Sequence, residues 1–144
     1  MIITTKKIDV FEQSRLLNNS SAGAYSSFEG WVRNENEGFR VLRLEYEIFE
    51  PIAIKEGKRI FDEAKEKYAI LNINGVHRSG LLEIGECAVW IGVVAAHRKE
   101  SFDACRFAID QIKIRLPIWK KEYYEDGNSE WVNCERCASV TGEV

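Results

Sequence analysis

The sequence predicts one domain of the α+β class. Helix-like and strand-like patterns follow one another along the whole chain, and no repeat or Pro/Gly/Ser-rich linker divides them. The 144 residues are 45% hydrophobic, which is enough for one compact core. We therefore expect a single domain over residues 1–144, ending in a short tail at about 133–144.

Local patterns place the elements along the chain. In order, we expect a strand at residues 2–5, a helix at 10–17, strands at 24–33 and 41–49, a helix that opens at 50, a strand at 69–77, a short segment at 81–86, a strand at 87–96, a helix at 101–116 and a hairpin over 120–132.

Turn and cap residues set several of these boundaries. The run Asn18-Asn19-Ser20-Ser21 ends the first helix, because its side chains compete for backbone hydrogen bonds. Glu50-Pro51 opens the second helix, since proline at the first position loses no needed donor. Pro117 ends the third helix, and the EDGN between KKEYY and SEWV is typical of a hairpin turn.

Apolar periodicity predicts the buried faces. The strand at 41–49 alternates leucines with charges, whereas CAVWIGVVAA at 87–96 is apolar throughout and is expected at the centre of the sheet. The second helix has an expected inner face of Ala53, Gly57, Ile60, Phe61, Ala64 and Tyr68. On its outer face, Glu63 and Lys67 are expected to pair. The third helix has an expected buried stripe of Phe102, Cys105, Ile109, Ile112 and Leu116.

Charge and hydropathy exclude several classes of protein. The formal net charge is -3, so no general attraction to nucleic acid or to an anionic membrane is expected. The first residues lack the cationic start and long apolar segment of a secretory signal, and the longest apolar run, 88–96, is too short to span a bilayer. We therefore expect a cytoplasmic protein.

The cysteines give no sign of metal or redox chemistry. Cys134 and Cys137 form a CxxC, but a strong zinc signal needs a second pair, and Cys87 and Cys105 are isolated. The sequence also has no Gly-rich nucleotide loop, GxSxG elbow or HExxH motif. We expect free thiols, no bound metal and no cofactor.

Lys113 is the first candidate for chemistry. At ~100° per residue it lies with Arg106 on the border of the apolar stripe, where an amine is partly desolvated. Desolvation and neighbouring cations lower the pKa of an amine toward neutrality, which suits an acid, a base or a nucleophile. The alternative is structural: Lys113 extends to solvent and pairs with Asp110, which Arg106 also reaches.

Cations also stand at both ends of this helix. His97 and Arg98 precede a first turn whose free N–H groups can face one anion, such as a phosphate; the alternative is a structural histidine at a strand end. Beyond the helix, Trp119 is expected to be an apolar anchor that fixes Lys120 and Lys121. The alternative is a solvated lysine pair that complements the helix dipole.

Two other positions are weaker candidates. Arg33 ends a strand beside the NENEG loop, where functional residues concentrate, although a surface charge is the alternative. His77-Arg78 precedes a tight Ser79-Gly80 turn, and we interpret this dipeptide as structural.

Several segments match one family in order and spacing. They are FEGWVRNENEG, LEYEIFEPIAIKE, VHRSGLLEIGE, VVAAHRKESFDACRFAIDQIKIRLPIWKKE and the closing EWV. The combination of HRxGxLxxGE, then AHR, then K-x3-P-x-W-K-K-E is highly specific. Over about residues 23–132 the chain therefore resembles the large, catalytic subunit of molybdopterin synthase.

The resemblance implies a fold and a function. The fold would be an α/β-hammerhead-type domain, with a mixed, mainly antiparallel sheet, helices and a C-terminal hairpin. The function would be that of a cytoplasmic sulfurtransferase that converts cyclic pyranopterin monophosphate, or precursor Z, to molybdopterin. Sulfur would come from the C-terminal glycine thiocarboxylate of a small ubiquitin-like subunit. Two large subunits would form a central homodimer, with one small subunit at each end of the heterotetramer.

The resemblance also implies roles for individual residues. Lys113 and Lys120 match the family's two important lysines and would be catalytic. The two lysines would also bind substrate, together with five further positions: Arg33, His97, Arg98, Lys121 and Glu122. Some of them would serve the neighbouring subunit, because the family's pocket lies close to the dimer interface.

Within this assignment we expect Lys113 to act as an acid, a base or the amine that activates the tail. Lys120 would stabilise charge as oxygen leaves and the cyclic phosphate opens. An anion clamp would consist of Arg33, His97 and Arg98. The chain departs from the family at Lys121, where an arginine is common, because lysine lacks the forked donor.

A second interpretation remains open. A non-enzymatic module could use the same basic groove to bind a ubiquitin-like tail or a phosphorylated small molecule. It would keep the clamp arginines but would not need a partly desolvated Lys113. A nucleic-acid-binding domain is disfavoured by the acidic balance and the lack of an aromatic and basic platform.

Overall fold

The computed structural model describes residues 1–133. Its elements are β1 (Ile2–Thr4), α1 (Val10–Leu16), β2 (Ala24–Trp31), β3 (Glu35–Asn36), β4 (Phe39–Ile48), α2 (Glu50–Lys67), β5 (Ile70–Arg78), β6 (Gly80–Glu83), β7 (Cys87–Ala95), α3 (Arg98–Arg115), β8 (Ile118–Tyr124) and β9 (Trp131–Asn133). Every expected element is present. The NENEG loop also holds the short strand β3, and α3 begins at Arg98 instead of Ser101.

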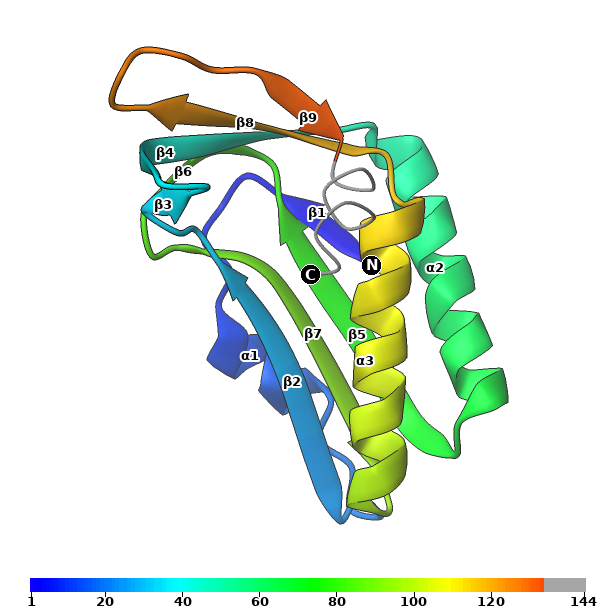
Figure 1. Ribbon diagram of the computed structural model, residues 1–144. Helices are drawn as coiled ribbons and strands as arrows, with labels where there is room; N and C mark the ends of the chain where they lie inside the picture. The colour runs from blue at the N-terminus through cyan, green and yellow to red at the C-terminus, as the bar shows by residue number, and fades with distance from the viewer. Residues whose placement is uncertain (134–144) are drawn as a thin grey trace.

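The strands form two sheets. The first has the order β1-β5-β7-β2, and only its β1–β5 pair is parallel. The second has the order β3-β4-β8-β9, with β6 also paired to β4, and is antiparallel throughout. Together with the helices (Figure 1), this arrangement confirms the predicted α+β class, the mainly antiparallel sheet and the C-terminal hairpin.

A single residue, Ser79, joins the two sheets by linking β5 to β6. Gly80 follows with a φ of +87°, a conformation that glycine adopts freely and other residues rarely do. The chain therefore turns out of the first sheet and into the second within one step. This joint places the end of β5 next to the second sheet.

Strand β7 lies inside the first sheet, as its apolar run predicts, and both of its faces are covered. Val89, Ile91 and Val93 belong to the main core cluster, which also holds the inner faces of α2 and α3. Trp90 and Val94 belong to a second cluster on the side of α1. Helices α2 and α3 cover one face of the sheet and α1 the other (Figure 1). Within residues 1–133, no helix is long and apolar enough to cross a membrane.

The inner face of α2 agrees with the prediction. The buried residues are Ala53, Gly57, Ile60, Phe61 and Ala64. Tyr68 is the C-cap residue and is only partly buried, because the chain has already left the helical conformation there.

The predicted stripe of α3 is wrong at Phe102, whose exposed fraction is 63%. The helix instead faces the sheet with small residues, including Ser101, Ala104 and Ala108. Small side chains let helix and sheet approach closely, and the Ser101 hydroxyl lies 2.6 Å from the Ser26 hydroxyl of β2. Phe102 is therefore displaced to the side of the helix that faces outward.

The predicted anchor Trp119 is also wrong. Its exposed fraction is 44%, whereas that of Ile118 is 1%. The chain enters β8 directly at Ile118, and the alternation of a strand turns each second side chain to the opposite face. Ile118 is therefore the anchor, and Lys120 shares its face of the strand while Trp119 does not.

An ion-pair cluster joins α2 to α3. The Arg115 guanidinium lies 2.6 Å from Glu56 and 2.7 Å from Glu63. The expected Glu63–Lys67 pair is therefore replaced by a contact between helices, which lowers the pKa of Glu63 by hydrogen bonding to Arg115. Lys67 instead lies over the Phe107 ring, 4.6 Å from its centroid.

Replacing Arg115 should weaken the packing of the two helices. The Arg115→Met variant keeps the apolar stem but loses the charged hydrogen bonds, and we expect a loss of about 1 kcal/mol in the free energy of unfolding. Urea unfolding followed by circular dichroism measures it. Arg59→Met is the matched control. Arg59 is largely exposed, and its distance to Glu56 is longer, at 3.7 Å. Equal losses in the two variants would contradict the cluster.

Candidate functional site

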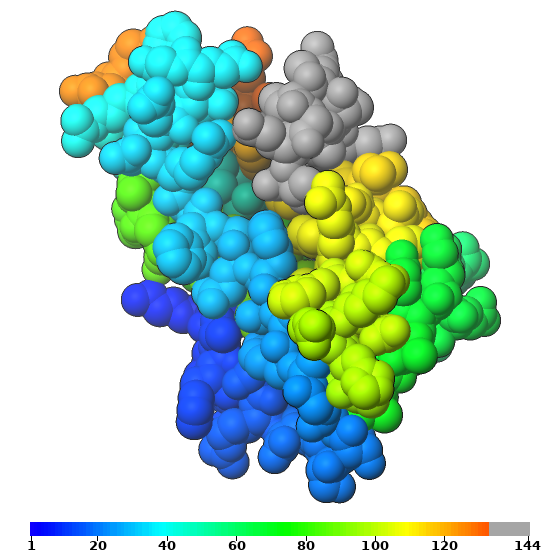
Figure 2. All heavy atoms as spheres, turned by 60° about the horizontal axis from the view of Figure 1, so that its bottom comes forward, coloured from blue at the N-terminus to red at the C-terminus, as the bar shows by residue number. Residues whose placement is uncertain are grey.

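A pocket of about 1400 Å³ lies where the two sheets meet α3. Strand β2 and helix α3 lie side by side on one face of the molecule (Figure 2) and form two of its walls. The remaining lining residues come from β3, β4, β7, β8, β9 and the segments that lead to β3 and β9. Phe28, Trp31 and Phe102 are among its lining residues, so Phe102 belongs to the pocket and not to the core.

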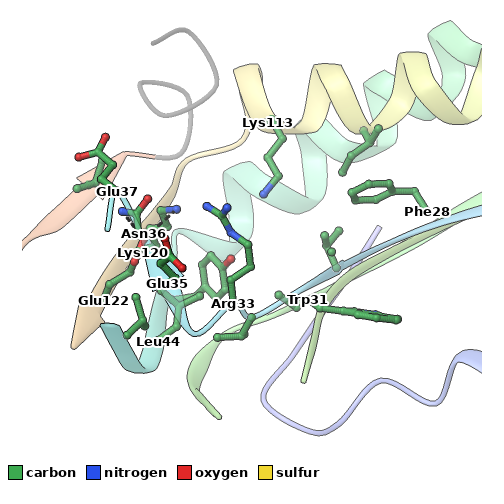
Figure 3. A pocket seen from close by; sticks show the side chains of 18 of the residues that line it. Phe28, Trp31, Arg33, Glu35, Asn36, Glu37, Leu44, Lys113, Lys120 and Glu122 are labelled. Carbon is green, nitrogen blue, oxygen red and sulfur yellow. Dashed lines mark hydrogen bonds and ion pairs between the residues drawn. The ribbon is translucent and has the colours of Figure 1, made fainter. Parts of the chain in front are cut away.

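Four of the predicted site residues line this pocket: Arg33, Lys113, Lys120 and Glu122. Lys113 extends from α3, and the Arg33 guanidinium faces its amine from the opposite wall (Figure 3). Lys120 extends from β8 into the same space, with 24% of its side chain exposed. Lys113 is half-buried, as its position at the border of the apolar stripe predicts.

Lys120 is held by a polar network. Its amine lies 3.2 Å from Glu122, which stands two residues further on the same face of β8. The Tyr124 hydroxyl donates to Glu122 at 3.2 Å, and the Asn36 amide donates to the Tyr124 oxygen at 3.0 Å. The hydrogen bonds fix Glu122, and Glu122 in turn fixes the lysine amine.

The structure does not bring every predicted residue to the pocket. His97 and Arg98 are exposed at the start of α3, and the 15 residues from Arg98 to Lys113 span roughly 22 Å of helix. Lys121 lies on the opposite face of β8, with its amine 5.1 Å from the centroid of the Tyr123 ring. Within one chain, these three residues are therefore separate from the site.

Arg106 shows that part of the structural interpretation also holds. Its guanidinium pairs with Asp110 at 3.6 Å, and 84% of its side chain is exposed at the pocket edge. The pocket thus has carboxylates as well as cations on its walls. Because Glu122 and Asp110 are each paired with a cation, the cations are held at fixed places.

Tyr46 escaped the sequence analysis, and His77 was interpreted there as structural. Tyr46 lines the pocket and is 7% exposed. It lies two residues after Leu44 and therefore on the same, inner face of β4. His77 lies behind it, fully buried, with the two ring centroids 4.9 Å apart. The alternation of apolar and charged residues along β4 could have indicated that Tyr46 faces inward. Only the joint between the two sheets brings His77 behind Tyr46.

The titration of His77 reflects these surroundings. Burial and, secondly, the Lys113 charge lower the pKa of His77 to about 3, although its hydrogen bond to the Arg78 carbonyl raises it. Cys105 also lines the pocket, and burial raises the pKa of its thiol to about 11. Both side chains are therefore neutral near pH 7, and the positive charge of the pocket comes from lysine and arginine.

Fold and site together define the class of protein. It is an α+β domain with a deep pocket, in which two lysines and an arginine can hold anionic groups and amines are available for acid–base chemistry. Residues 1–133 contain no cluster of three or more His, Cys, Asp or Glu side chains that could hold a metal ion. Cys134 and Cys137 lie outside the described residues.

Known proteins with a similar sequence and fold identify the family. The family model described as MoaE protein matches residues 3–115. The chain is 43% identical over 129 residues to the molybdopterin synthase catalytic subunit of Thermoplasma volcanium, covering 90% of this chain and 94% of that protein. It is 40% identical over 140 residues to that of Bos taurus, covering 97% of this chain and 74% of that protein. The chain therefore belongs to the MoaE protein family.

A solved structure agrees. The X-ray structure of molybdopterin synthase from Staphylococcus aureus matches with a TM-score of 0.87 and 38% sequence identity. The match covers 91% of this chain and 95% of that one. The arrangement of sheets and helices that builds the pocket is thus shared with an experimentally determined member of the class.

Proposed function

We propose that this chain is the catalytic subunit of a molybdopterin synthase. It converts cyclic pyranopterin monophosphate to molybdopterin, with sulfur from the C-terminal thiocarboxylate of a small ubiquitin-like subunit. The observation that carries the proposal is the meeting of Arg33, Lys113 and Lys120 in one pocket. We also propose that this reaction takes place in the cytoplasm.

The size and charge of the pocket suit two anionic reactants. Small-molecule sites usually enclose about 300–1,000 Å³, so about 1400 Å³ leaves room for a substrate and an extended peptide tail together. The cyclic phosphate and the thiocarboxylate repel one another, and three fixed cations offset that repulsion. Lys113 serves as the acid, base or tail-activating amine, and Lys120, fixed by Glu122, stabilises the developing charge.

The position of His97 and Arg98 favours a role in a second subunit. A two-fold axis perpendicular to α3 would run the helices of two copies in opposite directions. The start of one α3 would then lie near the Lys113 end of the other. In such a homodimer, the clamp of each pocket would combine Arg33 from one chain with His97 and Arg98 from its partner.

Mixing variants tests this division between chains. We expect Arg98→Ala and Lys113→Ala each to be inactive alone. In a mixed dimer both substitutions fall in one site, and the other site is intact. Random mixing makes about half of the dimers mixed, so about a quarter of the wild-type rate should return. Molybdopterin formation after co-refolding measures it. No recovery would show that Arg98 and Lys113 serve the same chain's site.

Reconstitution tests the function itself. Purified chain, thiocarboxylated small subunit and precursor Z should yield molybdopterin, detected as its fluorescent oxidised derivative. A small subunit with an ordinary carboxylate is the control, because it can bind but has no sulfur to give. Binding of both ligands without product would instead support the non-enzymatic binding module.

A further inference from the structure

We propose that His77 is a positioning residue of this site, a neutral ring that backs Tyr46 and supports the charge of Lys113 from behind the pocket wall. The inference rests on the proposed function, because its main readout is the synthase reaction. It gives the HRxG segment, which we interpreted as structural, a part in the chemistry.

The orientation and the tautomer of His77 are fixed. The residue lies near the end of β5 with an exposed fraction of 0%. Its Nδ1 is 2.7 Å from the carbonyl oxygen of Arg78. Because a carbonyl only accepts, Nδ1 carries the proton, and Nε2 of the neutral ring keeps a lone pair. Nε2 has no hydrogen-bond partner within residues 1–133, whereas buried polar atoms are normally paired.

Tyr46 connects this ring to the pocket. The two rings meet edge to face, at an interplanar angle of 86°. Tyr46 stands on β4 opposite Lys120 of β8 on one side and opposite Gly80 of β6 on the other. A shift of the imidazole would therefore move a pocket-lining side chain that is registered with one of the two lysines.

Lys113 approaches the same ring from α3. Its positive charge acts on His77 and favours the neutral imidazole. Lys113 on α3 and Tyr46 on β4 therefore both act on this ring, and its own strand contributes the Arg78 carbonyl. A neutral ring with an available lone pair makes the surroundings of the ammonium more polar without adding a competing cation.

Two substitutions separate the parts of this role. His77→Phe keeps a ring against Tyr46 but removes both nitrogens, and His77→Gln keeps an amide acceptor near the place of Nε2. Ile73→Ala is the matched folding control. Ile73 is only 5% exposed, lies on the same face of β5 as His77 and does not line the pocket. Each variant is assayed with the thiocarboxylated small subunit and precursor Z across a pH series.

We expect kcat of His77→Phe to fall by about tenfold, because small displacements of catalytic groups are costly, while the Kd for the small subunit stays within about twofold. The alkaline limb of its kcat profile should move to lower pH, since Lys113 loses polar support. His77→Gln should restore that limb. In the wild-type chain, 15N chemical shifts should show His77 protonated on Nδ1 alone at pH 6.

Other results would overturn the inference. If His77→Phe reacts at the wild-type rate, or loses activity only in proportion to unfolding as Ile73→Ala does, His77 is structural. An imidazole protonated on both nitrogens at pH 6 would also end the case. A wild-type chain that makes no molybdopterin refutes the proposed function instead, and the 15N measurement then still decides the state of the ring.

Discussion

Replacing Lys113 by alanine should lower the rate of molybdopterin formation by about 100-fold or more, the usual contribution of a positioned acid–base group. The side chain is half-buried in the pocket wall and faces Arg33 across the site (Figure 3). Its removal therefore takes away both a proton-transferring amine and one of the three converging charges. Single-turnover assays with preloaded small subunit measure the loss directly.

The controls for this prediction come from the same segment. Lys121→Ala removes a lysine from the opposite face of β8 and should keep near wild-type activity if Lys121 acts only in packing against Tyr123. Lys113→Arg keeps the positive charge but remains protonated at any working pH, so it should not restore the rate. A Lys113→Ala chain that folds, binds the small subunit and turns over normally would refute the assignment.

Acid should destabilise this protein through His77, and the effect should disappear when His77 is replaced. The pKa of His77 is lowered from 6.5 to about 3 in the folded chain. Below pH 6.5 the unfolded chain therefore binds a proton that the folded chain does not. The free energy of unfolding thus decreases as the pH is lowered, and this decrease ends near pH 3. Between pH 6.5 and pH 4 this one group should cost about 3 kcal/mol.

Urea unfolding at a series of pH values measures the effect. The slope of stability against pH should flatten in His77→Phe, whatever the variant's stability at pH 7. His97→Gln is the control, because the chain has only two histidines and His97 is exposed. A wild-type slope that survives in His77→Phe would mean that other groups cause the acid sensitivity.

The elements of the fold were predictable because local chemistry determines them. Proline and the polar Asn/Ser run mark helix ends, and the unbroken apolar run at 87–96 requires cover on both faces of a strand. The errors at Phe102 and Trp119 have a common cause. Periodicity tells which residues share a face, but the packing partner decides which face is buried, and α3 packs on the sheet through serine and alanine.

The site was predictable to a smaller extent. Lys113 was found from its place on a helix border, and Lys120 from its place just beyond the helix end and from the family motif, and both lie in the pocket. Asn36, Tyr46 and His77 come from three different strands, and their proximity depends on how the two sheets join, which no local pattern contains. His97 and Arg98 lie beyond reach within one chain, and their role stays a prediction about the dimer.

Cys105 has a consequence for how sulfur moves in the proposed reaction. With a pKa of about 11, only about one molecule in 10⁴ carries the thiolate at pH 7, and the thiolate is the form that attacks other sulfur centres. Among the described residues that line the pocket, Cys105 is thus poorly suited to carry the sulfur as a persulfide. Transfer would pass straight from the carrier's end to the pterin, and mild thiol alkylation should leave turnover intact.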